Sequence, residues 1–209
     1  VTFKTPHKYL AHITRNPLLE DLVLDLREEP DPQNETRKDF ERKIAAIFLK
    51  AHRYRRLRKI FLGFGDFLSR DKLAAPLKQF FEVSLPFLEK KGQFVDVEWQ
   101  CCNEFDRILE KLDPKHITRI DLINKNRDTD SYPISRFQNL KQLHVRESYN
   151  YPFTKSAAIT LDALEHLESL DIYLGLFDVA DQKNIYDRLK FPKNLKYLRF
   201  ESGMSKHKL

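Results

Sequence analysis

The sequence predicts an α/β fold in which about seven parallel strands are backed by helices. One observation is a phrase of the form Leu-x-x-Leu-x-(Ile or Phe), which occurs at 167–172 and again at 195–200 and places its apolar side chains on one side of a short strand. The second is the segment 178–190 between the two phrases, whose pattern predicts a helix. A strand and helix of this size bury their apolar face only against neighbouring copies, so the pattern indicates a repeat array.

In the N-terminal half, the same apolar phrase predicts strands at 18–26 and 57–64, and strict alternation predicts another at 94–99. Apolar side chains at helical spacing predict helices at 36–55 and 69–91. We expect Thr36 to cap the first helix, Pro86 to kink or end the second, and Asn103 to cap a short helix that ends before Pro114.

In the C-terminal half, the phrase predicts two further strands at 117–122 and 140–145, ahead of the two already described. Each strand is followed by a helix or a long connector, which favours parallel pairing because a hairpin does not need such a connection. Successive strand centres lie 23 to 38 residues apart, and the last four intervals fall within the 20–29 residues of leucine-rich repeats. We therefore predict an irregular leucine-rich-repeat-like solenoid that forms one domain over 1–209, with a frayed tail at 203–209.

Composition sets further bounds on this chain of 209 residues. Apolar residues make up 41% and charged residues 33%, with a net charge of +6, which indicates a folded chain whose surface charges are mostly mixed. Such a charge permits an acidic partner without requiring one. The adjacent Cys101 and Cys102 are expected to be reduced thiols, which favours the cytoplasm or the nucleus, and no apolar run is long enough to span a membrane. Because the chain starts at Val1, we expect it to be cut from a longer protein.

Glycines, histidines and carboxylates occur in the chain, but they do not form a recognised catalytic, phosphate-binding or metal-binding motif. Gly63 and Gly65 lack the rest of a phosphate-binding loop, and the seven histidines join no metal-ligand or nucleophile pattern, so we expect no enzyme activity, no cofactor and no metal. Asp96 and Glu98 lie two residues apart on one strand face, where paired carboxylates can do acid–base work, but we favour the interpretation that they belong to a charged solvent-facing surface.

The densest positive charge is the basic run at 52–59. One interpretation places it at the C-terminus of the preceding helix, where positive charge opposes the helix dipole favourably. The other is a contact with RNA or with an acidic protein, since interleaved Arg and Tyr can hold phosphates and stack on bases. The lack of a second basic and aromatic block argues against a nucleic-acid-binding domain.

A solenoid of this kind presents its outward strand positions as one concave face, which we predict to bind a partner protein. These positions are Asp25, Phe61, Asp96, Glu98, Asp121, His144, Arg146, Asp171, Tyr173, Arg199 and Glu201. We expect the face to be acidic through the middle. Phe61 is either a partner contact or a sign of a wrong register. Beside the face, Tyr149 and Tyr151 of the strand-exit loop 146–155 either anchor the partner or fold back on the core.

Four stretches, 16–24, 112–120, 137–143 and 164–172, resemble successive blocks of the FTH domain, which follows the F-box in nematode F-box proteins. The resemblance runs from about residue 8 to 202. One departure is that family members often carry a Trp where Phe137, Gln138 and Asn139 stand. No stretch after Val1 resembles an F-box, and the resemblance implies that one precedes it.

The resemblance implies a function in the ubiquitin pathway. A missing N-terminal F-box would bind the Skp adaptor and the cullin of a Skp–cullin–F-box ubiquitin ligase, and this chain would bind the substrate protein on its concave face or strand-exit loops. Two alternatives remain: a leucine-rich protein-interaction scaffold unrelated to ubiquitin, and an RNA-binding module centred on Arg53–Lys59.

Overall fold

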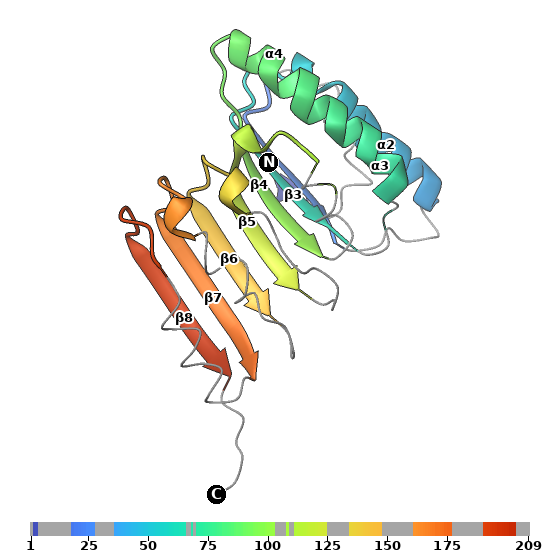
Figure 1. The fold of residues 1–209 in the computed structure, drawn as a ribbon. Helices are drawn as coiled ribbons and strands as arrows, with labels where there is room; N and C mark the ends of the chain where they lie inside the picture. Colours follow the sequence, from blue (N-terminus) through green and yellow to red (C-terminus); the bar gives the residue numbers. More distant parts are fainter. Residues whose placement is uncertain are drawn as a thin grey trace, which may run out of the picture. The chain divides into compact units, whose positions relative to one another are not determined.

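The structure, a computed structural model, describes residues 2–3, 18–27, 36–65, 68, 70–102, 108, 111–124, 134–147, 161–176 and 190–203. The chain divides into two compact units, Val1–His116 and Ile117–Leu209, which are described separately below. Within each unit, strands that follow one another in the chain lie side by side and run parallel (Figure 1).

The sheet of the first unit is built from β1 (Thr2–Phe3), β2 (Asp21–Leu26), β3 (Lys59–Phe64) and β4 (Asp96–Cys102). Register pairs Leu22 with Ile60 and Ile60 with Val97, and all three side chains are buried. Alternate residues along β2, β3 and β4 therefore form buried rows on one face, as the apolar pattern predicts.

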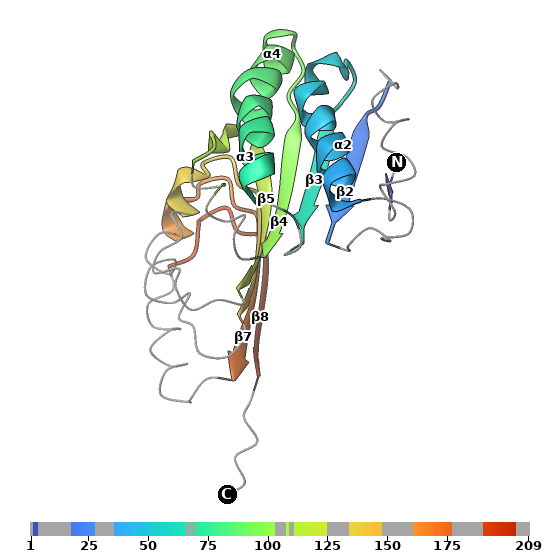
Figure 2. The same cartoon turned by 90° about the vertical axis from the view of Figure 1, so that its right-hand side faces the viewer.

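Helices α2 (Arg37–Leu49), α3 (Arg70–Gln79) and α4 (Leu85–Lys90) cover that buried face of the sheet (Figure 2). Thr36 caps α2 as predicted, since its hydroxyl accepts a hydrogen bond from the Asp39 backbone N–H at 3.2 Å. Between α3 and α4 the backbone forms a π-helical turn, Phe80–Ser84, in which the Leu85 N–H donates to the Phe80 carbonyl. Pro86, which has no N–H, follows at once, so the irregularity predicted there is a π turn within a helix that continues.

A chain of aromatic side chains fills the space between these helices and the sheet. Ring centroids lie 5.5 Å apart between Phe48 of α2 and Phe80, and 5.3 Å apart between Phe80 and Phe81. The chain continues to Trp99 of β4, which lies 6.2 Å from Phe81 and 4.9 Å from Phe64 of β3. Each such pair contributes roughly 0.5–1.5 kcal/mol beyond the area that it buries. Aromatic packing thus joins helices and strands in the first unit.

The sheet of the second unit is built from β5 (Ile117–Asn124), β6 (Gln142–Glu147), β7 (Ser169–Leu176) and β8 (Tyr197–Gly203). Its buried row joins Ile120, Leu143 and Leu170 in register, all fully buried. The row ends at Leu198 of β8, which is 46% exposed among the described residues although its phrase predicts a core position.

Three strands, β3, β6 and β7, are entered through a local motif that the sequence pattern did not predict. Short 3₁₀ helices, Ala51–Arg53, Ile134–Arg136 and Leu161–Ala163, each end in a second i→i+3 turn, as in the Phe137 N–H to Ile134 carbonyl and Leu140 N–H to Phe137 carbonyl bonds. Another 3₁₀ helix, Pro114–His116, leads directly into β5. After the turn, the next N–H donates to the preceding strand's entry, as Lys141 does to Thr118 at 2.8 Å. Apolar residues spaced by three are thus buried before the strand begins.

The predicted α/β class, with parallel strands backed by helices, is confirmed, and the seven predicted strands correspond to β2 through β8. Some strands begin about two residues later than predicted, as β3 does at Lys59 and β6 at Gln142. In these strands the first Leu of the apolar phrase belongs to the turn before the strand. The two-residue strand β1 was not predicted. The helix predicted at 178–190 and most of the short helix predicted after Asn103 lie outside the described residues.

Candidate binding surfaces

The outward strand face, the side of the strands opposite the buried rows, carries the predicted partner-binding positions. In the first unit, Phe61 pairs in register with Glu98 of β4, and both side chains are partly exposed. Its neighbours Ile60 and Leu62 are 1% and 0% exposed. Phe61 therefore has the predicted register, and the alternative of a misplaced strand is wrong.

Acidic side chains on this part of the outward strand face are paired with basic ones. Asp25 accepts two hydrogen bonds from the Arg27 guanidinium, at 2.6 and 2.5 Å, which hold the pKa of that carboxyl below its usual value. Glu98 lies 2.7 Å from the Lys59 ammonium on the neighbouring strand. Asp96 differs, because its buried Oδ1 has no hydrogen-bond partner among the described residues.

In the second unit, one row of the outward strand face crosses all four strands in register, through Asp121, His144, Asp171 and Arg199. Asp121 accepts from the Arg119 Nε at 3.0 Å and lies 3.6 Å from Nδ1 of His144. Arg199 pairs with Glu201 at 2.5 Å, and this contact raises the pKa of the guanidinium. Carboxylates and basic groups thus alternate along the row.

The adjoining row of the second unit pairs Arg146 with Tyr173 and Tyr173 with Glu201. Both Arg146 and Tyr173 are exposed, and 42% of the Tyr173 surface is accessible. These two side chains are therefore available for contacts. Tyr149 and Tyr151 lie outside the described residues.

The expectation of an acidic middle on this face is wrong for the described residues. Lys59 pairs with Glu98, and Arg119 pairs with Asp121, so basic residues that the prediction left out lie beside the carboxylates. Both share the outward parity of the acidic positions. Arg119 lies two residues before Asp121 on β5, whereas Lys59 is in register with Asp96 of β4 and reaches Glu98 diagonally. The described part of the face therefore carries both signs of charge. The ion pairs orient the side chains, and because their charges cancel they give the face little net electrostatic potential.

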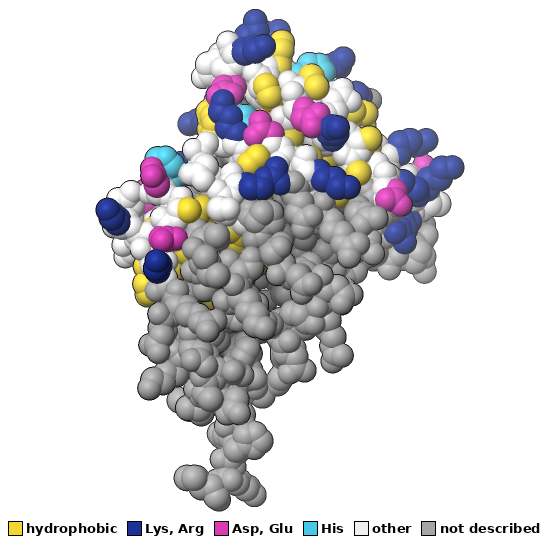
Figure 3. Space-filling model, in the orientation of Figure 1, with side chains coloured by type: hydrophobic (Ala, Val, Ile, Leu, Met, Phe, Trp, Pro, Cys, Tyr) yellow, Lys and Arg dark blue, Asp and Glu magenta, His cyan; other side chains and the backbone are white. Residues whose placement is uncertain are grey.

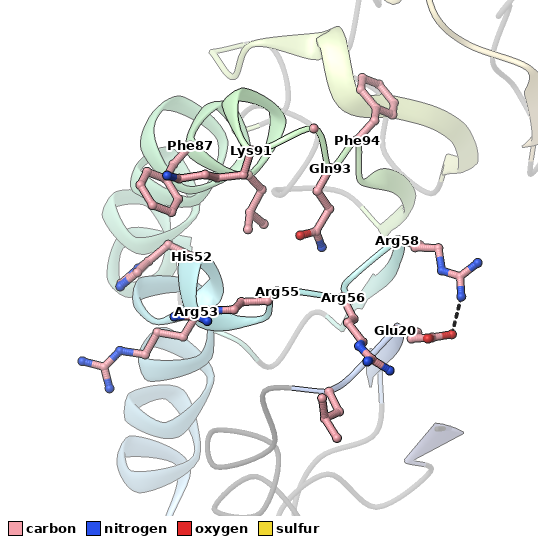
Figure 4. Close-up of a pocket in the computed structure, with 13 residues that line it drawn as sticks. Glu20, His52, Arg53, Arg55, Arg56, Arg58, Phe87, Lys91, Gln93 and Phe94 are labelled. Carbon is pink, nitrogen blue, oxygen red and sulfur yellow. Dashed lines mark hydrogen bonds and ion pairs between the residues drawn. The ribbon is translucent and has the colours of Figure 1, made fainter.

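A second surface feature of the first unit is a hollow of about 1490 Å³ beside the strand-entry turns, which we call the basic hollow (Figure 4). Its lining comes from the residues just before β2, the turn before β3, and α4 with the loop that follows. The lining residues are Leu18, Glu20, His52, Arg53, Arg55, Arg56, Arg58, Phe87, Leu88, Lys91, Gly92, Gln93 and Phe94. Five of them are Arg or Lys and one is acidic, so positive charge dominates the lining.

The walls of the basic hollow are held together by Gln93. Its side-chain amide donates to the Tyr54 carbonyl at 3.1 Å and to the Leu57 carbonyl, so the loop after α4 is tied to the turn before β3. In Figure 4 this side chain reaches from one wall towards the other. These two hydrogen bonds therefore hold the backbone at both ends of the turn that carries Arg55 and Arg56.

Aromatic rings on the α4 side of the basic hollow are partly covered by cationic or imidazole groups. Lys91 Nζ lies 5.7 Å from the Phe87 ring centroid, and the His52 ring meets the same ring edge-on at 6.3 Å. Phe94 stacks on the imidazole of His116 with 4.7 Å between ring centroids. Phe87 and Phe94 are nevertheless 44% and 41% exposed.

The structure corrects the helix-dipole interpretation of the basic run. No basic residue lies in the last turn of α2; the run occupies a 3₁₀ helix, the turn at 55–56 and the entry to β3. Sequence reasoning also missed the aromatic partners, which come from residues about 30 to 40 positions later. The sequence did contain a sign of this exposed turn at 55–56. Apolar residues recur every three positions at Ala51, Tyr54 and Leu57, and the same spacing occurs at 161, 164 and 167.

The described residues hold neither a metal-binding cluster nor a membrane-spanning helix. In that part of the chain no group of three or more His, Cys, Asp or Glu side chains could hold a metal ion. None of its helices has both the length and the apolar character needed to cross a membrane.

Fold and surfaces together define a repeat-built α/β protein with parallel strands, an outward polar strand face and a basic hollow. Comparison with known families matches residues 89–208 to the FTH domain. This match covers more than half of the chain, and the chain belongs to the FTH domain family. Neither the curated proteins nor the solved structures that were compared contain a match.

Proposed function

We propose that the chain is the substrate-recognition part of an F-box protein, which brings a target protein to a Skp–cullin–F-box ubiquitin ligase. Family membership supports the ubiquitin link, because the FTH domain is associated with F-box proteins. In this proposal the F-box lies upstream of Val1 and binds the Skp adaptor, and the ligase acts in the cytoplasm or the nucleus.

The observation that carries the recognition role is the outward strand face of the second unit. Its row of alternating acidic and basic side chains spans four strands in register, and the exposed Arg146 and Tyr173 lie in the adjoining row. Such a face offers many polar contacts in fixed positions, with an aromatic side chain of the type enriched at protein interfaces. The substrate is proposed to bind here through complementary charges.

The test is affinity purification of the full-length protein from its own cells, with the associated proteins identified by mass spectrometry. We expect the Skp adaptor and at least one further protein, the substrate. The double variant Arg146→Glu with Arg199→Glu should retain the adaptor and reduce recovery of the substrate by about tenfold, because it reverses two exposed charges on the face.

The matched control is Lys141→Glu with Lys193→Glu, which makes the same charge change at exposed strand-entry positions of the second unit. This variant should keep both proteins. Purification without a Skp adaptor would refute the ubiquitin link. Undiminished substrate recovery by the Arg146 and Arg199 variant would refute recognition by the outward strand face. If the chain is instead a leucine-rich scaffold unrelated to ubiquitin, the Skp adaptor should be absent, but the Arg146 and Arg199 variant should still recover less of the bound protein.

A further inference from the structure

The basic hollow contains positive charge that the described part of the chain does not neutralise. Arg58 pairs with Glu20 at 2.5 Å, which uses the acidic group of the lining. Arg53, Arg55 and Arg56 form no ion pair with any residue that the structure describes, and all three are exposed. Elsewhere on the first unit charges are mixed: in Figure 3 basic and acidic side chains intermingle over the helices. The basic hollow is therefore a local positive site.

The same hollow also exposes large apolar side chains beside its positive charges. Leu18 is 61% exposed, Phe87 44% and Phe94 41%, so three of the nine exposed large apolar side chains among the described residues line one hollow. Apolar surface gathered in one place beside charge is typical of a binding site, because covering it removes apolar area from water.

We propose that the basic hollow docks an acidic segment of a partner protein in which carboxylates flank an apolar side chain. The carboxylates would accept hydrogen bonds from the guanidinium groups of Arg55 and Arg56 at one wall, and the apolar side chain would cover Leu18, Phe87 and Phe94. The volume of about 1490 Å³ exceeds the roughly 300–1,000 Å³ of small-molecule sites, which fits several residues of a peptide.

The geometry favours an acidic peptide over RNA. Single-stranded RNA sites combine a line of cations along the backbone with aromatic faces open for stacking. Here the cations cluster on one turn and its flanks, with Lys91 on the opposite wall. Lys91 lies over the ring of Phe87, and His116 stacks on the ring of Phe94. Both rings are thus better suited to edge contacts with an apolar side chain than to base stacking.

This docking site lies at the strand-entry side of the first unit and does not use the outward strand face of the second. It does not rest on the proposed function: a partner at the basic hollow requires neither the F-box nor the ubiquitin ligase. The two proposals can therefore fail separately.

The experiment is a fluorescence-anisotropy titration of the 209-residue chain with a labelled peptide in which Glu and Asp flank a Leu-Phe pair. Two competitors are a peptide of the same sequence with Gln and Asn in place of the acids, and an oligouridylate. We expect binding of the acidic peptide that weakens with salt, and at least about tenfold weaker binding by both competitors.

Variants locate the contact. Arg55→Glu with Arg56→Glu should weaken peptide binding about tenfold or more, whereas Arg55→Lys with Arg56→Lys should retain most of it. The matched control, Lys38→Glu with Arg42→Glu on α2, makes the same charge change at exposed positions outside the lining and should bind as the unaltered chain does. Phe94→Ala should weaken binding without changing its salt dependence. Circular dichroism of each variant shows whether it is folded.

Three results would overturn the proposal. The first is equal binding of the amide-matched peptide, which would exclude recognition of acids. The second is undiminished peptide binding by a folded Arg55→Glu, Arg56→Glu variant, which would place the contact elsewhere. The third is tighter binding of the oligouridylate than of the acidic peptide with a steep salt dependence, which would make the hollow a nucleic-acid site.

Discussion

The Tyr54 side chain is fully enclosed beside the basic hollow, and its hydroxyl has no hydrogen-bond partner among the described residues. Burial raises the pKa of Tyr54 to about 12, against the smaller effect of the Arg53 charge. An enclosed hydroxyl without a partner costs free energy, since its bonds to water are lost on folding. The ring therefore stabilises the turn, and the hydroxyl does not.

We predict that Tyr54→Phe leaves the free energy of unfolding unchanged or raises it by up to about 1 kcal/mol, because it removes an unsatisfied polar atom and keeps the ring. Urea denaturation followed by circular dichroism measures this. Tyr197→Phe, at a side chain 51% exposed, is the control and should change little. A loss of more than about 1 kcal/mol for Tyr54→Phe would mean that the hydroxyl has a partner.

His116 is a buried imidazole at the end of the first unit. Burial lowers its pKa below 6.5, while the Val95 carbonyl, 3.2 Å from Nδ1, and the charge of Glu89 act in the opposite direction. Glu89 Oε2 lies 3.9 Å from Nε2, and Lys115 pairs with the same carboxylate at 2.6 Å. The folded chain therefore favours the neutral imidazole.

It follows that the free energy of unfolding decreases as the pH falls through 6.5, because the unfolded chain binds a proton that His116 in the folded chain does not. This decrease ends below the lowered pKa of the folded state. His116→Gln should flatten the pH dependence in this window, measured by urea denaturation at a series of pH values. His166→Gln, at an exposed site in the second unit, should leave it in place. An identical pH profile for His116→Gln would refute the assignment.

At the scale of elements, the exit of β3 depends on close backbone approach. A Cβ at Gly65 would lie 2.8 Å from the Arg27 carbonyl oxygen and 2.9 Å from that of Leu26, whose carbonyl accepts the Gly65 N–H at 3.0 Å. A Cβ at Gly63 would instead meet the side chains of Phe61 and Asp25, at 3.1 and 3.3 Å. Only at Gly65 is the obstacle backbone that is already hydrogen-bonded.

We therefore predict that Gly65→Ala lowers the free energy of unfolding by about 2 kcal/mol, because the β2 and β3 ends must move apart. Gly63→Ala is the matched control and should cost less than about 1 kcal/mol, since side chains can rotate and alanine restricts the unfolded chain. Thermal and urea denaturation measure both. Equal costs at the two positions would show that the close approach at Gly65 is not the limiting contact.

The 3₁₀ helix and turn before a strand also determine which side chains are exposed for binding. Two i→i+3 turns place apolar residues spaced by three in the core and leave the two central residues of the second turn exposed, as at 55–56 and 165–166. In the first unit these residues are Arg55 and Arg56, whereas in the second they are Glu165 and His166. A constant backbone motif thus presents different charges, so that strand-entry turns can vary in binding without affecting the core.

At the scale of the molecule, the net charge of +6 is less informative than its distribution. On the outward strand face, Arg27, Lys59, Arg119 and Arg199 pair with carboxylates. In the basic hollow, Arg53, Arg55 and Arg56 pair with none of the described carboxylates. Recognition at the two surfaces should therefore respond differently to salt, more strongly at the hollow because its field is not cancelled locally.

The fold was predictable where the determining interactions are local. The apolar phrases predicted β2, β3 and β5 to β8, and strict alternation predicted β4. The positions of α2 and α3 followed from helical spacing, and the Thr36 cap from the residue types at the start of α2. The late strand starts and the π turn before Pro86 were not predicted, because 3₁₀ and π geometry depend on hydrogen bonds rather than on apolar period. β1 is two residues long and carries no period to recognise.

The candidate site was predictable only in part. The outward positions of the strands, such as Asp121, His144 and Arg199, were identified correctly as one face because side chains alternate with a period of two. That they bind a partner stays a prediction. The basic hollow was identified only as a run of charge at 52–59, since Phe87 and Phe94 belong to other elements.

The sequence by itself determined the α/β class, the order of strands and helices, and which residues of each strand face outward, because periodicity is a property of neighbours in the chain. The tertiary structure decided which of those residues meet. Parallel pairing set Lys59 beside Glu98, and packing of α4 beside the turn before β3 set Phe87 and Lys91 across from Arg55 and Arg56. These contacts join residues about 30 to 40 positions apart, and their register follows from core packing that no local pattern records.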